Sequence, residues 1–157
     1  MPTTPVTAAS KERECRIRQS IRALRVLQRS EGSAVQAYEK AIEQSGFAAP
    51  MGLRQAARAH RARARALTVR IHELGGKPSR GLGVWAVVDQ IMQAWTAIIG
   101  KNAVISALQR SEVRRVAEYR RRIPELDSES QWLVREDLLA EQVGTHDLMR
   151  NLMRIPA

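Results

Sequence analysis

The sequence predicts an all-α protein, a four-helix bundle in a single domain. Ala, Leu, Arg, Glu and Gln, which favour helices, dominate the 157-residue chain. Aromatic residues make up only 4% of the chain, and aromatic and β-branched residues together are too few for a sheet. Apolar residues recur every three or four positions over long segments, which is the spacing of an amphipathic helix. These observations exclude an all-β or α/β fold.

A first helical hairpin is predicted over about residues 10–75, after a flexible N-terminal segment over 1–9. The N-terminal segment is rich in Pro, Thr and Ala, and Ser10 is a suitable N-cap for the first helix. A Ser-Gly pair separates the two helices, and a Gly-Gly pair followed by proline ends the second helix. These helix-breaking residues are Ser45, Gly46, Gly75, Gly76 and Pro78.

A connector helix is predicted over about residues 83–99, and a second helical hairpin over about 102–153. A glycine closes the connector, and an Ile-Pro pair ends the third long helix. The last helix is expected to start at Ser128, because Ser128 and Gln131 have the spacing of a capping box. Together these elements predict one domain over 10–155.

One ionisable residue interrupts the apolar seam of each long helix near its middle. When the seams are followed at alternating spacings of three and four, these residues are Glu31, His60, Glu112 and His146. Burying an unpaired carboxylate or imidazole costs several kcal/mol, so four unpaired groups in the core would strongly destabilise the fold. We therefore expect the four side chains to meet in the core.

An internal repeat supports this arrangement. The segment LQRSE at 27–31 recurs at 108–112, and a tyrosine stands seven residues after each Glu, as Tyr38 and Tyr119. In each half of the chain, a seam histidine lies on the next long helix. Two hairpins that each contribute one Glu and one His predict a bundle with a pseudo-twofold axis.

This arrangement resembles the ferritin-like superfamily, which includes ferritins and rubrerythrins. The resemblance covers about residues 14–153. It rests on the order of Glu and His on the helices, the run IHELGGKPS, Trp85 and the paired LQRSE segments with their tyrosines. Within the superfamily, the chain looks like a bacterial branch that consists mostly of domains of unknown function, some linked to stress. The resemblance implies a ferritin-like fold with a helical crossover, and a stress-related role.

The chain departs from the superfamily where a two-metal centre would need its bridging ligands. Such a centre needs a carboxylate three residues before each His, and these positions hold Ala57 and Val143. We therefore expect no dinuclear ferroxidase centre. The cluster is either structural, in a non-enzymatic protein, or it binds one Fe, Mn or Zn ion in a single-metal redox protein. In both interpretations Tyr38, Tyr119 and Gln142 are expected to lie beside it.

The strongly basic composition allows a third interpretation. The chain has 26 Lys and Arg against 16 Asp and Glu, a net charge of +10, which favours polyanionic partners. Arginines form a stripe opposite much of the apolar seam on each of the first two helices: Arg22, Arg25 and Arg29, then Arg54, Arg58, Arg61 and Arg65. These stripes either bind nucleic acid through its phosphates, without sequence specificity, or only solvate Ala-rich helices.

The connector helix carries an apolar face that is wider than one bundle contact needs. Its large side chains Trp85, Met92 and Trp95 predict a homodimer through this segment, or a lid across the bundle. Polar residues interrupt the same segment, so it is not expected to span a membrane. With one cysteine, Cys15, and no signal-like apolar stretch at the N-terminus, the expected location is the cytoplasm.

Overall fold

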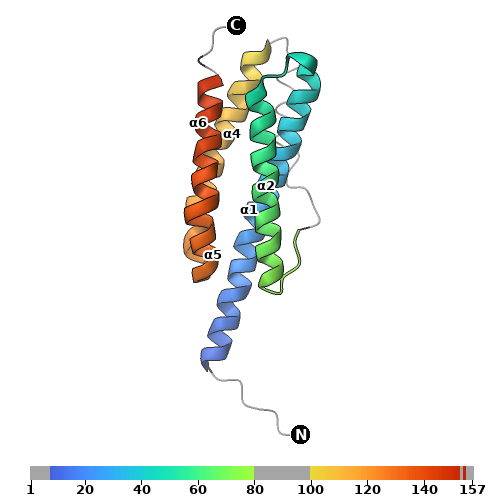
Figure 1. Ribbon diagram of the computed structural model, residues 1–157. Coiled ribbons are helices and arrows are strands. Elements are labelled where there is room, and N and C mark those ends of the chain that lie inside the picture. Colours follow the sequence, from blue (N-terminus) through green and yellow to red (C-terminus); the bar gives the residue numbers. More distant parts are fainter. Residues whose placement is uncertain (1–7, 80–99, 153, 155–157) are drawn as a thin grey trace.

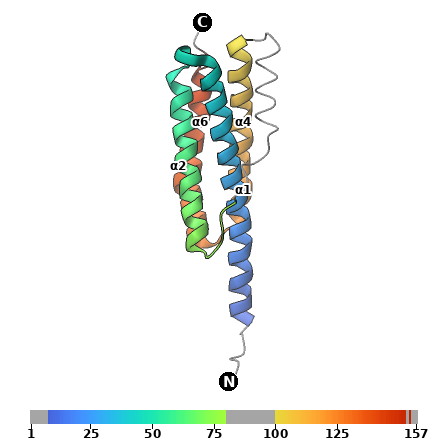
Figure 2. The ribbon, with the colours of Figure 1, turned by 90° about the vertical axis from the view of Figure 1, so that its right-hand side faces the viewer.

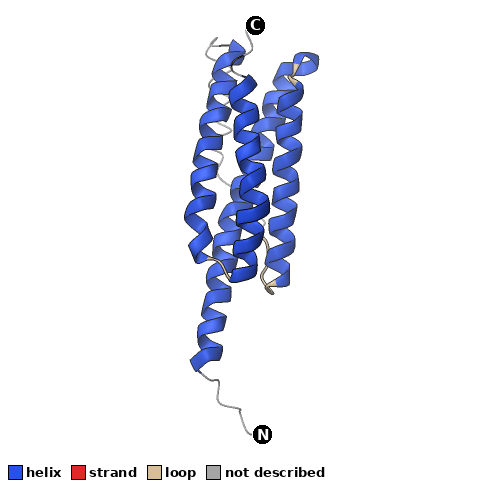
Figure 3. Ribbon diagram, turned by 60° about the vertical axis from the view of Figure 1, so that its left-hand side comes forward, coloured by secondary structure: helices blue, strands red, loops and turns tan. Residues whose placement is uncertain are grey.

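Four long helices lie side by side in the computed structural model (Figure 1). The structure describes residues 8–79, 100–152 and 154. Within these ranges no strand occurs, and only short loops interrupt the helices (Figure 3). The predicted all-α class is therefore confirmed for this part of the chain. The predicted connector helix, with Trp85, Met92 and Trp95, lies outside the described residues.

The helices of each neighbouring pair run in opposite directions (Figures 1 and 2). Helix α1 is antiparallel to α2 and to α4, and α4 is antiparallel to α6. The elements in chain order are α1 (Ala8–Ser45), the 3₁₀ turn η1 (Gly46–Ala48), α2 (Met51–Glu73), α4 (Gly100–Arg122), the 3₁₀ turn η2 (Ile123–Glu125), α5 (Ser128–Trp132), the π-helical segment η3 (Leu133–Leu138) and α6 (Leu139–Leu152). The last three form one continuous helix, the fourth long helix.

Two glycines end the helices of the first hairpin as predicted. Gly46 and Gly75 have φ angles of 55° and 75°, in the left-handed region that favours glycine. After the second helix, the amide of Gly75 donates to the carbonyl of His72 at 2.9 Å. The first helix begins at Ala8, ahead of the predicted cap Ser10, which therefore lies inside the helix.

The start of α5 corrects a second predicted cap. The N-cap is Asp127, whose extended backbone (φ −66°, ψ 162°) precedes the helix and whose carboxylate accepts from the amide of Ser130. The helix starts at Ser128, as predicted, but Ser128 is its first helical residue and not its cap. Gln131 does not complete a capping box, because its side-chain amide donates to the carbonyl of Leu126 at 3.1 Å.

The core consists of two apolar clusters with a polar layer between them. One cluster contains Ala34, Ala37, Tyr38, Ala41, Leu53, Ala56, Ala57, Val104, Ile105, Leu108 and Met149. The other contains Ala23, Leu24, Leu27, Leu67, Ile71, Tyr119, Ile123, Leu126, Val134 and Leu138. On every long helix the polar layer falls between the residues of the two clusters. Each helix in the described ranges is too short or too polar to cross a lipid bilayer.

Candidate functional site

The polar layer holds three of the four ionisable residues that the sequence placed at mid-seam. Glu31 of α1, His60 of α2 and Glu112 of α4 are each 0% exposed. They lie within hydrogen-bonding or ion-pairing distance of one another. Together with the residues that contact them we call this group the central cluster: Glu31, Tyr38, His60, Arg63, Glu112, Arg115, Tyr119, Gln142 and Thr145.

His60 lies between the two carboxylates. Its Nδ1 is 2.7 Å from Glu31 Oε2, and its Nε2 is 3.3 Å from Glu112 Oε1. The second contact is an ion-pair distance without hydrogen-bond alignment. Burial by itself lowers the pKa of the His60 imidazole, but Glu112 and Glu31 outweigh this effect and raise the pKa above its ordinary value. The protonated form of His60 is thus the form that the cluster stabilises.

The two tyrosines of the sequence repeat make reciprocal hydrogen bonds between α1 and α4. Tyr38 donates to Glu112 Oε1 at 3.1 Å, and Tyr119 donates to Glu31 Oε1 at 2.9 Å. Because α1 and α4 are antiparallel, a tyrosine two turns after the glutamate of one helix lies level with the glutamate of the other. Burial and the neighbouring carboxylate raise both tyrosine pKa values well above the ordinary value of 10.0, so the hydroxyls remain donors.

Two buried arginines supply positive charge beside the carboxylates. Arg63 of α2 is 0% exposed and donates to Glu31 Oε2 at 3.2 Å and to Thr145 Oγ1 at 3.2 Å. Arg115 of α4 is 5% exposed and donates to Glu112 Oε1 at 3.1 Å. Each carboxylate therefore has its own guanidinium group. A buried ion pair of this kind requires good geometry, because both charges have lost their water.

The two arginines were not predicted from the sequence, although a signal for them exists. Arg63 stands three residues after His60 and Arg115 three residues after Glu112. Residues at this spacing share one face of a helix. Arg63 also lies off the predicted stripe of its own helix. Both arginines could therefore have been predicted, because each lies one turn after an ionisable residue on the inward face of its helix.

His146 does not join the central cluster, which corrects the sequence prediction. Its side chain is 22% exposed, and its Nδ1 lies 3.4 Å from Asp147 Oδ1. The inward face of this helix instead carries Gln142 and Thr145, which are 0% and 5% exposed. At about 3.6 residues per turn, His146 falls at the edge of that face. Gln142 contacts the cluster as expected, because its Nε2 donates to Glu112 Oε2 at 2.6 Å.

The donors around the two glutamates keep them ionised. Burial alone raises the pKa of Glu112, but His60, Arg115 and Gln142 together lower it from 4.5 to about 2. Burial also raises the pKa of Glu31, and His60, Arg63 and Arg115 reverse that effect, so its pKa is below 4.5. The cluster therefore holds two carboxylates opposite two guanidinium groups and one imidazole.

The residues of the central cluster do not fit a metal ion. All four carboxylate oxygens of Glu31 and Glu112 already accept hydrogen bonds from protein donors. A divalent cation would have to displace these donors, and two adjacent guanidinium groups would repel it. Among the described residues, no group of three or more His, Cys, Asp and Glu is arranged to hold a metal ion.

The arginine stripes lie on the outside of the first hairpin, as predicted. Five of the seven arginines are exposed: Arg22, Arg29, Arg54, Arg58 and Arg65. The other two are half-buried and have partners. Arg25 donates to the carbonyl of Lys77 at 2.7 Å, and Arg61 forms an ion pair with Glu39. The basic surface is therefore partly compensated on α2 and less so on α1.

Comparisons of the chain with protein-family models, with curated proteins and with solved structures gave no match. The function is therefore inferred from the geometry of the central cluster and from the charged surface around it.

Proposed function

We propose that the chain is a ferritin-like four-helix bundle of two related hairpins joined by a helical crossover, and that its role is non-enzymatic. In this proposal the central cluster is structural and holds the helices in register without a metal ion. The observation that carries it is the complete use of the Glu31 and Glu112 oxygens by protein donors, two of which are guanidinium groups. Buried carboxylates whose oxygens all accept hydrogen bonds in this way favour one arrangement of the helices over others.

The arginines give this proposal its physical basis. In the two-metal centres of ferritin-like proteins, the cations neutralise inward carboxylates. Here Arg63 and Arg115 supply positive charge at 3.2 Å from Glu31 and 3.1 Å from Glu112. The arginines thus take over the role that the resemblance assigns to metal ions. The positions at which bridging carboxylates would stand, Ala57 and Val143, offer no replacement ligand.

The burial of the cluster also supports a non-enzymatic role. A catalytic acid, base or nucleophile must touch its substrate. Glu31, His60 and Glu112 are each 0% exposed, and the two apolar clusters of the core enclose them. A substrate could reach these groups only if the helices separated.

Metal content and stability together test this proposal. We compare untagged wild type with Glu31→Gln/Glu112→Gln, and with Glu39→Gln/Glu43→Gln as a surface control with the same change in charge. Plasma mass spectrometry should find far less than about one ion per chain in all three proteins. Only the buried double variant should lose stability in urea, because its donors lose their charged acceptors. A stoichiometric ion that is lost specifically from the buried variant would overturn the proposal.

A second candidate function is non-specific nucleic-acid binding through the arginine stripes. Five stripe arginines on α1 and α2 are exposed, and the chain carries a net charge of +10. This function requires an affinity for duplex DNA that falls steeply as salt rises. It also requires that Arg22→Ala/Arg29→Ala and Arg58→Ala/Arg65→Ala each weaken binding. An affinity that is insensitive to both pairs of substitutions would count against it.

Three further expectations stay predictions. The homodimer through Trp85, Met92 and Trp95 depends on residues outside the described ranges. Light scattering on wild type and on Trp85→Ala/Trp95→Ala tests it, since a folded variant of unchanged mass removes the prediction. The stress-related role rests on the resemblance alone, and the cytoplasmic location rests on composition.

A further inference from the structure

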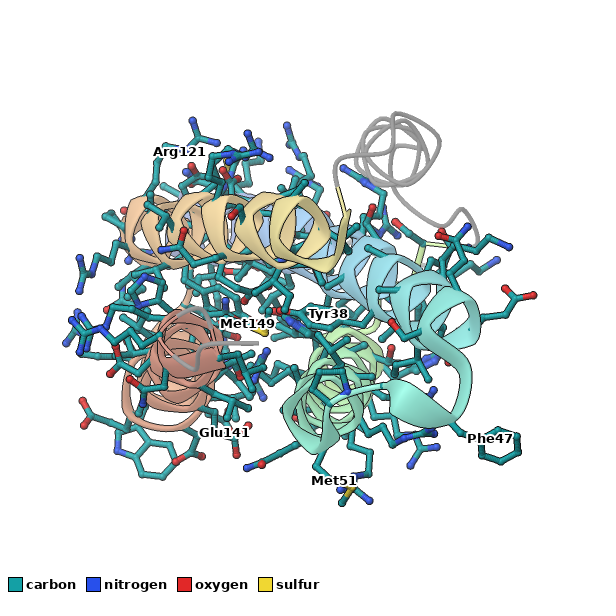
Figure 4. The ribbon with its side chains drawn as sticks, turned by 90° about the horizontal axis from the view of Figure 1, so that it is seen from above. Tyr38, Phe47, Met51, Arg121, Glu141 and Met149 are labelled. Atoms are coloured by element: carbon teal, nitrogen blue, oxygen red, sulfur yellow. The ribbon has the colours of Figure 1, made fainter. Side chains whose placement is uncertain are left out.

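A groove lies on the outer side of the contact between α1 and α4. It has a volume of about 500 Å³. Its charged lining consists of Arg29, Arg114, Arg115, Glu118, Arg121 and Arg122. Figure 4 shows Arg121 on the outer side of α4, whereas Tyr38 and Met149 point between the helices. We call this feature the α1–α4 groove.

The positive charge of the groove is only partly compensated. Among the described residues, Glu118 is the one acidic residue of the lining, against five arginines. Outside the lining, Glu112 pairs with Arg115 and Glu125 pairs with Arg122. Glu118 forms ion pairs with both Arg121 and Arg122. Arg114 is exposed and forms no ion pair with any described residue. The guanidinium group of Arg29 donates at 3.2 Å to the hydroxyl of Ser79, which carries no charge.

Arg115 forms a fixed part of the groove wall. Its side chain is 6% exposed, and three contacts hold its guanidinium group. Nε donates to the carbonyl of Ser30 at 3.4 Å, and Nη1 donates to Ser111 Oγ at 2.6 Å and to Glu112 Oε1 at 3.1 Å. The remaining nitrogen, Nη2, has no hydrogen-bond partner among the described residues. A buried side chain that lines the groove thus keeps one donor group unused.

We propose that the α1–α4 groove binds small anions that carry two or more phosphate groups. Guanidinium groups form paired, charge-assisted hydrogen bonds with phosphate oxygens, and five arginines line this groove. Two of them, Arg29 and Arg114, form no ion pair with a described residue. The volume is that of a small-molecule site. Among the described residues, the lining contains one apolar residue, Val26, and no aromatic side chain. In this part of the chain the groove offers phosphate-binding groups and no ring to stack on a base, so we expect recognition through the phosphate groups.

This proposal shares one residue, Arg115, with the central cluster, and it differs from the proposed nucleic-acid surface. Of the stripe arginines only Arg29 lines the groove. The residues that single out the groove are Arg114 and Arg115 of α4. The two proposals also differ in ligand size: the groove should bind a compact polyphosphate, whereas the stripes should need a longer nucleic acid.

Titration calorimetry with sodium tripolyphosphate tests the proposal at physiological ionic strength. Arg29→Ala/Arg114→Ala removes two exposed groove arginines. Arg58→Ala/Arg65→Ala is the matched control, since it removes the same charge from the exposed face of α2. We expect one saturable site per chain, weakened at least about tenfold in the groove variant and less than about twofold in the control. Circular dichroism confirms that both variants are folded.

A third variant tests the fixed donor. Arg115→Lys keeps a positive charge beside Glu112 but loses the planar donor pair, so it should also weaken tripolyphosphate binding. Equal affinity for tripolyphosphate and a nucleoside triphosphate would identify the bare phosphate chain as the ligand, and tighter binding of the nucleotide would identify nucleotides. The absence of saturable binding to wild type would overturn the proposal. Equal weakening in the groove and control variants would do the same, as would binding of long oligonucleotides alone.

Discussion

Arg63 shows at the scale of one residue how the core tolerates charge. Its guanidinium group is fully buried and contacts Glu31, His60 and Thr145. The 2.8 Å distance between Arg63 Nη2 and His60 Nδ1 sets a constraint, because Nδ1 can donate to Glu31 or accept from Arg63 but not both. With the pKa of His60 raised, donation to Glu31 prevails, and Arg63 is held by Glu31 and Thr145.

The first prediction concerns Arg63→Met, which keeps much of the side-chain volume and removes the charge. We expect it to lower the free energy of unfolding by roughly 3 kcal/mol, because Glu31 stays buried without its guanidinium partner. Arg65→Met, on the exposed face of the same helix, should change it by less than about 0.5 kcal/mol. Urea denaturation measures both values. Similar small losses in the two variants would show that the ion pair contributes little.

The second prediction separates the two tyrosines. Among the described residues, Tyr119 is the one donor to Glu31 Oε1, whereas Glu112 Oε1 still accepts from Arg115 after Tyr38 is removed. Tyr119→Phe should therefore cost about 2 kcal/mol and Tyr38→Phe about 1 kcal/mol. Thermal and urea denaturation of the two variants give the order, and the reverse order would contradict this account of the network.

Most of the central cluster could be predicted from sequence at this scale. Glu31, His60 and Glu112 interrupt apolar seams, and an unpaired charge in a seam requires partners. The sequence could not show which of two neighbouring positions points inward on the last helix. Thr145 and His146 are adjacent in sequence, so a rotation of the helix by part of a turn decides which of the two faces the core.

At the scale of the element, the start of α5 links three segments of the chain. Asp127 caps the helix, and its carboxylate also accepts from Arg70 at 2.9 Å. Its backbone amide donates to Ser20 Oγ of α1 at 2.6 Å. Arg70 in turn donates to Ser130 Oγ at 2.8 Å. One short turn therefore connects α1, α2 and α5 at this end of the molecule.

The third prediction follows from this turn. Asp127→Ala should lower stability by about 1 to 2 kcal/mol through the lost cap, and further through the lost contact with Arg70. Ser128→Ala should be nearly neutral, because Ser128 is exposed and makes no cap. Differential scanning calorimetry compares the two. A larger loss of stability in the Ser128 variant would contradict this and would support the capping box that the sequence predicts.

The π-helical segment η3 had no recognisable signal in the sequence. Its residues Leu133–Leu138 follow the same apolar pattern as an α-helix, and two of them, Val134 and Leu138, are buried. A π-helical turn contains more residues than an α-helical turn, so it changes which side of the following helix faces the core. The position of His146 at the edge of that face is consistent with this change.

At the scale of the whole molecule, the central cluster makes stability depend on pH in both directions. The pKa of His60 is raised above 6.5, so its contribution is full below 6.5 and is lost as the pH rises through the raised pKa. The pKa of Glu112 is lowered from 4.5 to about 2, so its contribution is full above 4.5 and is lost as the pH falls towards 2. Glu31 acts in the same direction as Glu112.

The fourth prediction is therefore a stability maximum between about pH 4.5 and pH 6.5 in the cluster's contribution. Urea denaturation across a pH series measures it. His60→Gln should flatten the decline above the maximum, whereas His72→Gln, at an exposed position of the same helix, should leave the curve unchanged. A curve that stays the same in the His60 variant would mean that this imidazole does not carry the alkaline dependence.

The overall architecture was more predictable than its details. Residue types and apolar spacing predict four long helices, and glycines end two of them at Gly46 and Gly75, as expected. Helix ends set by side chains were less predictable, because Ser10, Asp127 and Ser128 all have residue types that can cap a helix. Tertiary contacts, such as that between Ser20 and the amide of Asp127, decide among them.

The first turns of α1 extend beyond the ends of the other helices, as Figures 1 and 2 show. Residues 8–16 are exposed on every side, so these turns gain no tertiary packing. A helical segment of this length is marginal on its own, and it persists here as a continuation of the packed helix. The backbone of these turns should therefore open far more often than the rest of α1.

The fifth prediction concerns limited proteolysis of the first turns of α1. Trypsin should cut after Lys11, Arg13 or Arg16 before it cuts at any arginine of the packed helices, because a protease needs an opened backbone. Mass spectrometry of the first fragments identifies the sites, and the trimmed protein should keep its unfolding midpoint. First cuts at stripe arginines such as Arg58 would show that the packed part opens as easily. The projecting turns thus mark where cooperative folding ends along α1: the packed residues unfold together with the bundle, and the residues before them can open on their own.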